Sequence, residues 1–168
     1  MKIIIQKFGG TSVSTEERRK MAVKKINNAI KEGYMPVVVV SALGRKGEPY
    51  ATDTLLSLVD NNFKKNNKKA LDMLMCCGEI ISSVIMCNEL RKEGIDAIPL
   101  TGGQAGIITN DSFGDAKVLD VKSDNIKKML LKGKIPVVCG FQGKTENEEF
   151  STLGRGGSDT TAALLGAS

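Results

Sequence analysis

Two glycine-rich turns carry charged side chains that could bind an anion. They read Lys7-Phe8-Gly9-Gly10-Thr11-Ser12 and Leu153-Gly154-Arg155-Gly156-Gly157-Ser158-Asp159. Paired glycines let backbone amides approach an anion closely, and a helix that begins just beyond them adds the positive end of its dipole. The lysine of the first turn and the arginine of the second add a fixed cation. Turns of this kind receive phosphates and carboxylates.

A third glycine turn, Thr101-Gly102-Gly103-Gln104-Ala105-Gly106, has no cation. None of the three turns is a Walker A loop or a GxGxxG fingerprint. Because a structural turn explains each of them when taken singly, the prediction of an anion site rests on the two turns that combine amides with a cation.

Glu79 is the only charged residue between Met73 and Cys87, in a predicted helix that is apolar on almost every side. A buried carboxylate is costly unless it is paired or faces a cavity. Two interpretations stay open at this point. Glu79 either forms a structural ion pair with an Arg or Lys, or lines a cleft and contacts a cationic ligand group such as an amine.

The composition excludes several classes of chemistry. The 168 residues contain no histidine, so the commonest general base, Ser/His/Asp and Cys/His arrangements and imidazole metal sites are all excluded. The four cysteines have no zinc or disulfide spacing and are predicted to be reduced thiols. The N-terminus does not resemble a signal peptide, and no segment is expected to cross a bilayer. We therefore expect a cytoplasmic protein with no membrane partner.

The formal net charge of +5 is concentrated near the N-terminus. Residues 1–48 contain ten Lys/Arg and four Asp/Glu, whereas residues 49–168 contain fourteen and fifteen. Most of the excess lies on a predicted helix over 15–32, where a solvated face explains it. We therefore expect no nucleic-acid partner.

Strand and helix patterns alternate along the chain. Strands are predicted at 2–6, 35–40, 95–100, 104–109 and 134–140, and helices at 15–32, 52–60, 69–93, 121–132 and 159–168. Residues 61–69 are predicted to be a loop or helix junction, and residues 143–151 a polar loop. The alternation predicts an α/β fold, a parallel sheet with helices on both faces. The final apolar segment has no strand after it, so the fold is expected to be incomplete on its C-terminal side.

Seven motifs distributed over the whole chain resemble the aspartokinases of the amino-acid kinase family. They are Lys7-Phe8-Gly9-Gly10-Thr11-Ser12-Val13, Val39-Val40-Ser41-Ala42, Thr52-Asp53, Gly78-Glu79, Gln104-Ala105-Gly106-Ile107, Gly140-Phe141-Gln142-Gly143 and Thr152-Leu153-Gly154-Arg155-Gly156-Gly157-Ser158-Asp159. The first and the last are the most specific. Composition and periodicity alone indicate only an α/β protein that binds an anion.

The resemblance implies a three-layer αβα sandwich on a mainly parallel sheet. It implies ATP-dependent phosphorylation of the β-carboxylate of L-aspartate to aspartyl β-phosphate, the first step toward lysine, threonine, methionine and diaminopimelate. The Mg²⁺ would be carried by ATP, without a metal site of the protein, and the enzyme would be a homo-oligomer. Because a carboxylate acceptor is already ionised at neutral pH, this reaction needs no general base, which agrees with the absence of histidine.

The resemblance also implies roles for individual residues. The ATP phosphates would be held by Lys7, Phe8, Gly9 and Gly10. Aspartate would be bound by Thr52, Glu79, Arg155, Gly156, Gly157 and Ser158, with Ser41 as a further candidate. Arg155 would take a carboxylate and Glu79 would lie near the ammonium. Lys7 and Asp159 would be catalytic, with Asp159 orienting Lys7 or organising the charge around the metal and phosphates.

The chain departs from the family pattern in two places. The loop over 43–51 is longer than the link expected before the Thr-Asp pair, which leaves Thr54 as an alternative to Thr52. In the family, the sheet continues beyond the position of Ser168 into a segment that binds the nucleotide base and ribose, and ACT regulatory modules follow. Residues 1–168 are therefore expected to be the N-terminal, substrate-side portion of a catalytic domain, inactive alone.

Two alternatives remain. One is another amino-acid kinase, such as a glutamate, acetylglutamate or uridylate kinase. The other is a non-catalytic module that binds an anion or nucleic acid through the basic helix.

Overall fold

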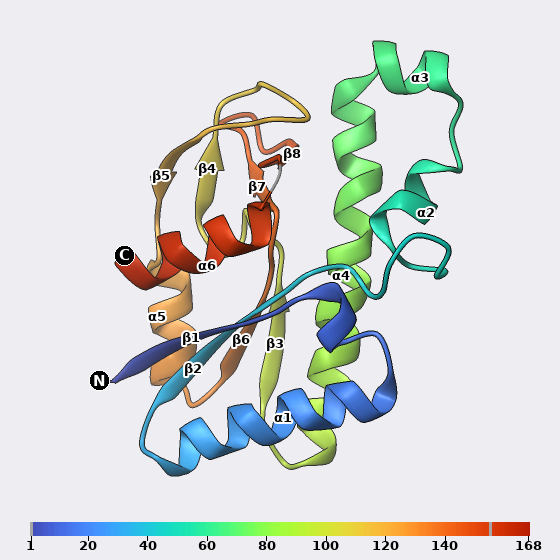
Figure 1. The fold of residues 1–168 in the computed structure, drawn as a ribbon. Helices are drawn as coiled ribbons and strands as arrows, with labels where there is room; N and C mark the ends of the chain where they lie inside the picture. Colours follow the sequence, from blue (N-terminus) through green and yellow to red (C-terminus); the bar gives the residue numbers. More distant parts are fainter. Residues whose placement is uncertain (1, 155) are drawn as a thin grey trace.

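The centre of the protein is a four-stranded parallel sheet (Figure 1). The computed structural model describes residues 2–154 and 156–168. The strands lie in the order β1 (Ile3–Phe8), β2 (Met35–Val40), β6 (Ile135–Cys139) and β3 (Ala97–Leu100). Residues Val37–Val40 are fully buried because β2 lies inside the sheet, where both faces are covered. The prediction of a parallel α/β sheet is confirmed.

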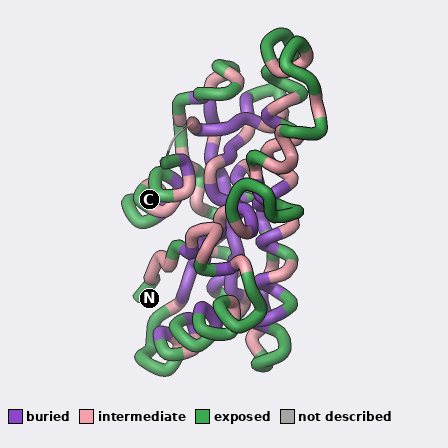
Figure 2. The backbone as a smooth tube through the Cα atoms, turned by 45° about the vertical axis from the view of Figure 1, so that its right-hand side comes forward, coloured by how far each residue is buried: buried purple, intermediate pink, exposed green. Residues whose placement is uncertain are grey.

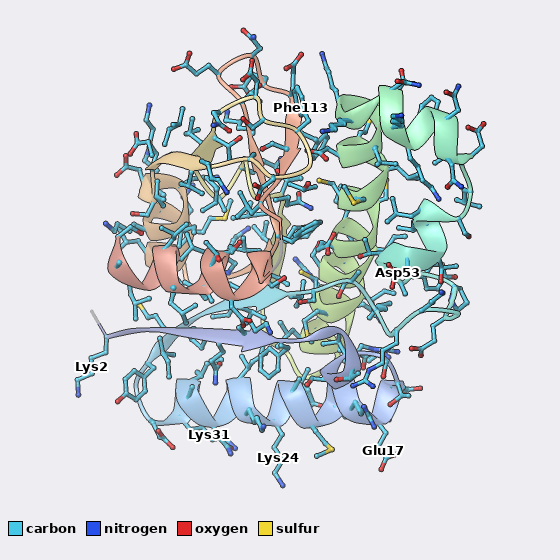
Figure 3. All side chains as sticks on the ribbon, turned by 45° about the horizontal axis from the view of Figure 1, so that its top comes forward. Lys2, Glu17, Lys24, Lys31, Asp53 and Phe113 are labelled. Atoms are coloured by element: carbon cyan, nitrogen blue, oxygen red, sulfur yellow. The ribbon has the colours of Figure 1, made fainter. Side chains whose placement is uncertain are left out.

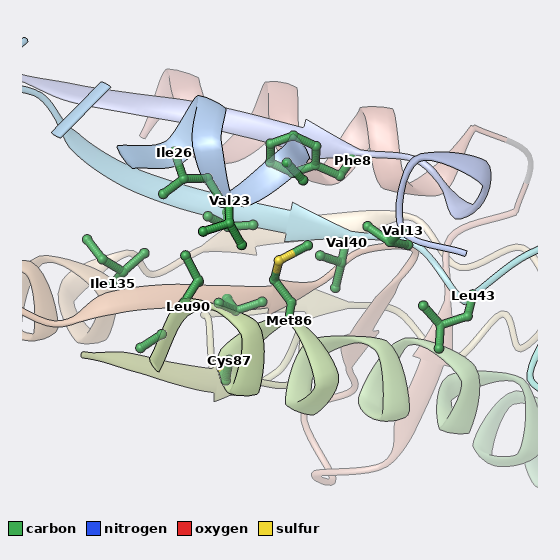
Figure 4. Packing of buried hydrophobic residues seen from close by; sticks show 14 residues of the cluster. Phe8, Val13, Val23, Ile26, Val40, Leu43, Met86, Cys87, Leu90 and Ile135 are labelled. Atoms are coloured by element: carbon green, nitrogen blue, oxygen red, sulfur yellow. The ribbon is translucent and has the colours of Figure 1, made fainter. Parts of the chain in front are cut away.

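Helices cover both faces of this sheet. Val38 and Val40 point to one face and pack with α1 (Glu16–Lys31) and α4 (Lys68–Lys92). Figure 4 shows Val40 between residues of these two helices. Val37 and Val39 point to the other face, because successive residues of a strand alternate, and pack with α5 (Asp124–Leu131) and α6 (Gly157–Ala167). The result is the αβα sandwich that was predicted.

A second, mixed sheet was missed in the sequence except for one strand, because the strand predicted over 104–109 contains Ile107–Thr109. Its order is β5 (Val118–Val121), β4 (Ile107–Thr109), β7 (Gln142–Lys144) and β8 (Phe150–Thr152). The predicted polar loop over 143–151 is therefore wrong at both ends, since β7 and β8 form an antiparallel hairpin there. The predicted helix from 121 was also placed too early, because 118–121 are a strand. Strands of three or four residues are too short to show a period of two.

The segment between β2 and α4 forms two short helices. Helix α2 (Thr52–Leu56) is shorter than the helix predicted over 52–60. Helix α3 (Asn61–Asn66) occupies most of the predicted junction, and the Asp60 side chain caps it by accepting a 2.8 Å hydrogen bond from the Phe63 amide. Its Asn/Lys composition has no apolar period, so the pattern did not indicate a helix.

Helix α4 is long and apolar enough, by length and composition, to cross a membrane. Its mean hydropathy is 1.7 over an 18-residue window, an apolar length that the sequence analysis did not recognise. However, 44% of that window is buried inside the protein. Figure 2 shows the buried stretches of the chain in purple. The buried positions include three acidic residues, Asp72, Glu79 and Glu89. The core helix of a folded domain passes the same test.

The basic helix α1 turns its charges away from the sheet. Ala22, Val23, Ile26 and Ala29 are its buried residues, whereas Lys24 and Lys31 project outward in Figure 3. The solvated face predicted for this helix is what the structure shows.

Candidate functional site

The carboxyl ends of three parallel strands meet at one edge of the central sheet. Phe8 of β1 pairs with Val40 of β2, and Val40 pairs with Cys139 of β6. The residues that follow these strands, 9–10, 41–42 and 140–141, therefore lie side by side. Open α/β sheets bind their ligands at this position.

A cavity of about 670 Å³ lies at this edge. Its walls come from the turns after β1, β2 and β6, from the loop before α2, from α4 and from the start of α6. The described residues that line it are Lys7, Gly10, Ser41, Ala42, Gly44, Arg45, Lys46, Ala51, Thr52, Asp53, Glu79, Phe141, Gly154, Gly156, Gly157, Ser158 and Asp159. The two charged glycine turns identified in the sequence are thus brought to one site.

Lys7 and Asp159 form an ion pair across this cavity. The distance from Lys7 Nζ to Asp159 Oδ1 is 3.0 Å. Lys7 lies near the end of β1, and Asp159 lies in the first turn of α6, where a carboxylate is stabilised by the helix dipole. The pair fixes the position of the lysine ammonium at the cavity wall.

Glycines let the start of α6 approach the sheet closely. A Cβ at Gly140 would lie 2.6 Å from Ser158 Oγ, and one at Gly157 would lie 2.6 Å from the Phe141 ring. This approach brings the Ser41 hydroxyl within 2.9 Å of Ser158 Oγ, to which it donates a hydrogen bond. Two hydroxyls from distant parts of the chain therefore stand together in the cavity.

Glu79 faces the cavity from α4 and is 3% exposed. Its Oε2 atom is buried and has no hydrogen-bond partner among the described residues. Burial raises the pKa of this carboxyl to about 8, although a backbone hydrogen bond from Ala42 acts in the opposite direction. No ion pair of Glu79 occurs in the described part of the chain, so the structural ion-pair interpretation has no support. An unsatisfied acceptor that borders a cavity fits the ligand-binding interpretation.

Thr52 and Thr54 occupy different environments. Thr52 lines the cavity at the first position of α2. The Thr54 hydroxyl instead accepts a 3.2 Å hydrogen bond from the Gly47 amide, inside the preceding loop. The geometry favours Thr52 for contact with a ligand and gives Thr54 a role in the loop.

Two residues predicted for the site, Phe8 and Gly9, are not in the cavity lining. The Phe8 side chain packs in the core, and its carbonyl accepts a 3.2 Å hydrogen bond from the Ser41 amide. Gly9 is outside the cavity lining, although a Cβ there would be 3.6 Å from Lys7 Nζ. Arg155 lies outside the described residues. The third glycine turn serves packing, because a Cβ at Gly102 or Gly106 would collide with the backbone of Gln142 or Lys122.

Eight residues of the cavity lining were given no role from the sequence, and four of them have charged or aromatic side chains: Arg45, Lys46, Asp53 and Phe141. Phe141 follows the carboxyl end of β6 and has a φ of 70°, a left-handed conformation that is uncommon for this residue type. Its Gly-Phe-Gln-Gly motif and its place after an apolar strand could have indicated the position. Asp53 lies on α2 beside α4 in Figure 3. Arg45 and Lys46 lie in the loop that was noted only for its length.

A second buried carboxylate, Asp72, was also missed. It is fully buried on α4, and its Oδ2 accepts hydrogen bonds from the amides of Gly114 (3.0 Å) and Thr152 (2.8 Å). The Thr152 hydroxyl lies 3.0 Å from Oδ1. Burial raises the pKa of Asp72 despite these three contacts. Asp72 fastens α4 to the end of β8, two residues before the turn that begins at Gly154.

The cysteines match the prediction of unpaired thiols. Cys76, Cys87 and Cys139 are buried and Cys77 is half-buried. Burial raises the pKa of Cys87 and Cys139 to about 12 and that of Cys76 further, so these thiols stay protonated.

The fold and the cavity define an α/β protein with a charged cavity beyond the carboxyl ends of its parallel strands, where open α/β sheets place their ligands. The amino acid kinase family is matched by residues 2–168, and the chain belongs to this family. It is 51% identical over 167 residues to aspartokinase 1 of Bacillus subtilis and 42% identical over 167 residues to the aspartokinase of Geobacillus stearothermophilus.

These alignments cover 99% of the chain but only 41% and 40% of the two relatives, so the chain spans about two fifths of their length. The structure also resembles that of the aspartate kinase from Synechocystis, with a TM-score of 0.79 and 37% identity. That match covers 99% of this chain and 26% of the other.

Proposed function

We propose that the chain is the N-terminal, substrate-side portion of an enzyme that phosphorylates the β-carboxylate of L-aspartate with ATP. The product is aspartyl β-phosphate. One observation carries the proposal: a lysine fixed by a carboxylate, and a buried carboxyl without a hydrogen-bond partner in the described chain, line the same cavity. The relatives described above, which are named aspartokinases, support the choice of aspartate as the acceptor.

The chemistry requires positioning and positive charge more than proton transfer. The aspartate β-carboxylate is ionised at neutral pH and can attack the γ-phosphorus directly. Phosphoryl transfer then depends on in-line geometry and on cations around the transferred group. The Lys7 ammonium, held by Asp159, supplies a cation of fixed position. The Gly10 turn beside it supplies a backbone that a phosphate can approach closely.

The amino acid is assigned to other groups that line the same cavity. In this proposal, the Glu79 carboxylate accepts the hydrogen bonds of the substrate ammonium, which gives its buried oxygen a partner. The hydroxyls of Ser41, Thr52 and Ser158 and the turn at Gly156–Gly157 contact the substrate carboxylates. Arg155 is proposed for bidentate carboxylate binding on the basis of the sequence motif alone.

The residues present fit a magnesium ion that arrives with the nucleotide. Mg²⁺ in kinase sites uses one or two carboxylates together with substrate phosphates. Among the described residues, no group of three or more possible ligands forms a protein-only metal site, but Asp53 and Asp159 both border the cavity. Bound Mg²⁺ would neutralise charge on the phosphates. We favour Asp159 as the residue that contacts this Mg²⁺, because it is paired with Lys7, the residue assigned to the phosphates.

We also propose that the protein acts in the cytoplasm, in the biosynthesis of the aspartate-derived amino acids, and that it forms a homo-oligomer. The exposed outer face of α4 supports the last point. Met73 is 57% exposed and Val84 is 52% exposed on this face. Sedimentation of the purified protein tests it, since a monomer at micromolar concentration would contradict it.

The acceptor specificity tests the proposal directly. The protein encoded by the complete reading frame is incubated with MgATP and hydroxylamine, which traps an acyl phosphate as a hydroxamate. Aspartate should give hydroxamate and ADP in equal amounts, whereas glutamate, N-acetylglutamate and UMP should give no product. Turnover with one of those acceptors and not with aspartate would identify a different amino-acid kinase. Tight DNA binding with a steep salt dependence, without turnover, would favour a non-catalytic module.

A further inference from the structure

The loop between β2 and α2 presents two cations to the cavity. Arg45 and Lys46 both line it, although both are exposed at the level of the whole residue. Among the described residues, neither side chain forms an ion pair. Their charges therefore stay available to a ligand.

The loop has a defined shape that keeps these two residues in place. Gly44 and Gly47 have φ values of 78° and 94°, which favour glycine and turn the chain sharply. The Glu48 carboxylate accepts a hydrogen bond from the Arg45 amide, and the Thr54 hydroxyl accepts one from the Gly47 amide. The turn that carries Arg45 and Lys46 is thus held by hydrogen bonds within the loop and by one to Thr54 of α2.

The same loop lies directly on the glycine turn after β1. The Gly44 amide donates a 3.0 Å hydrogen bond to the Gly10 carbonyl. A Cβ at Gly10 would be 2.6 Å from the Ala42 carbonyl oxygen and 2.8 Å from that of Gly44. Gly44, the residue before Arg45, therefore contacts the Gly10 turn that is proposed to bind phosphate. This contact places Arg45 and Lys46 on the Lys7 side of the cavity.

The charges in the cavity indicate which ligand group these cations serve. Lys7 is paired with Asp159, and Asp53 adds another negative charge, so Lys7 alone cannot neutralise a polyphosphate. We propose that Arg45 and Lys46 bind the terminal phosphates of the nucleotide. This inference rests on the proposed kinase function and adds a second cationic element to the site. The guanidinium can hold two phosphate oxygens at once, and the ammonium acts as a point charge.

Inorganic tripolyphosphate tests the inference without catalysis. The purified protein is titrated calorimetrically with tripolyphosphate, as the double variant Arg45→Gln/Lys46→Gln and as the wild type. The control is Lys24→Gln/Lys31→Gln, which removes the same charge from α1, whose two lysines project into solvent (Figure 3). We expect at least tenfold weaker binding in the loop variant and less than a twofold change in the control. Equal weakening in both variants, or no binding by the wild type, would overturn the inference.

Steady-state kinetics separate the phosphate subsite from the amino-acid subsite. In the loop variant of the protein encoded by the complete reading frame, the KM for ATP should rise about tenfold, while the KM for aspartate should change less than twofold. A rise confined to the KM for aspartate would overturn the inference, because the loop would then serve the acceptor. If aspartate is not a substrate at all but the loop variant still loses tripolyphosphate binding, the proposed acceptor is wrong and the phosphate assignment stands.

Discussion

Lys7 and Asp159, from the first strand and the last helix of the chain, form a 3.0 Å ion pair at the cavity wall. The Asp159 side chain is 75% exposed, so solvent screens the attraction and the pair adds little to the stability of the fold. Its effect is to restrict the Lys7 ammonium to one position. In the proposed reaction this position is next to the phosphoryl group in transit.

The first prediction concerns the two residues as a unit. The Lys7 ammonium is expected to stabilise the negative charge that develops on the phosphoryl group in the transition state. Lys7→Met removes this stabilisation, so it should lower kcat far more than it raises either KM. Asp159→Asn should lower kcat as well, by releasing the lysine from its orientation. The double variant should be little worse than the worse single variant, because the second change removes a function already lost.

Steady-state kinetics of all four proteins, each made from the complete reading frame, measure this cycle, and thermal melting provides the control. Each variant should melt close to the wild type, since the pair is largely exposed. Additive losses in log kcat would show that the two residues act independently. An unchanged kcat in Lys7→Met would remove the lysine from the catalytic assignment.

The second prediction concerns the buried Asp72 on α4. In Asp72→Asn the amide oxygen can replace Oδ2, and the amide nitrogen can donate to the Thr152 hydroxyl, so the melting temperature should stay within a few degrees. Asp72→Ala leaves the buried amides of Gly114 and Thr152 without this acceptor. Each unsatisfied group costs about 1–3 kcal/mol, and the melting temperature should fall by roughly 5–15 °C.

Differential scanning calorimetry distinguishes these outcomes. Equal losses in the Asn and Ala variants would mean that the negative charge, rather than the hydrogen-bond acceptor, is what α4 requires. Wild-type stability in Asp72→Ala would show that these contacts are dispensable.

The central sheet could be predicted because its strands are continuous apolar runs. Val37–Val40 and the Pro136–Cys139 run have a composition typical of buried parallel strands, and both are strands. The mixed sheet could not, apart from its Ile107–Thr109 strand, because its residues are brought together only by the fold. Thr109 and Ser151, for example, are distant in the sequence, and their hydroxyl oxygens lie 2.6 Å apart. Short polar strands carry no periodic signal.

The site also contains residues that the sequence indicates and residues that only the fold brings together. Lys7, Glu79 and Asp159 stand out in the sequence because their charges interrupt glycine turns or an apolar helix. Arg45 and Lys46 lie in a run with other charged residues, and only the hydrogen bond between Gly44 and Gly10 brings that run to the cavity. Asp72 was hidden because its partners, at 114 and 152, are distant in the sequence.

The third prediction is that the 168 residues alone bind aspartate but have little or no kinase activity. The chain covers 41% and 40% of the two relatives, and its cavity holds the groups proposed for the phosphates and the amino acid. Contacts to phosphates alone do not fix an in-line geometry. A coupled assay for ADP should stay far below the usual kinase turnover of about 1–100 per second. Aspartate-dependent turnover in that range would contradict the prediction.

The last prediction concerns the protonation of Glu79. An exposed glutamate titrates near about 4.3, whereas burial raises the pKa of Glu79 to about 8. Between these values the folded protein binds a proton that the unfolded chain has released, so this residue's contribution to stability decreases as pH rises through that window. Glu79→Gln cannot ionise. Urea unfolding at pH 5 to 8 should therefore show the variant gaining stability relative to the wild type as pH increases.

Substrate binding should act on the same proton. An ammonium that enters the cavity favours the ionised carboxylate, so aspartate binding at pH 7 should release a proton, and its affinity should increase up to about pH 8. Calorimetry in buffers of different ionisation enthalpy measures the proton count. In Glu79→Gln the proton release should disappear, and binding should weaken by roughly 1.5–3 kcal/mol, the scale of a hydrogen bond to a charged group. A large loss of thermal stability with an unchanged KM for aspartate would instead make Glu79 a structural residue.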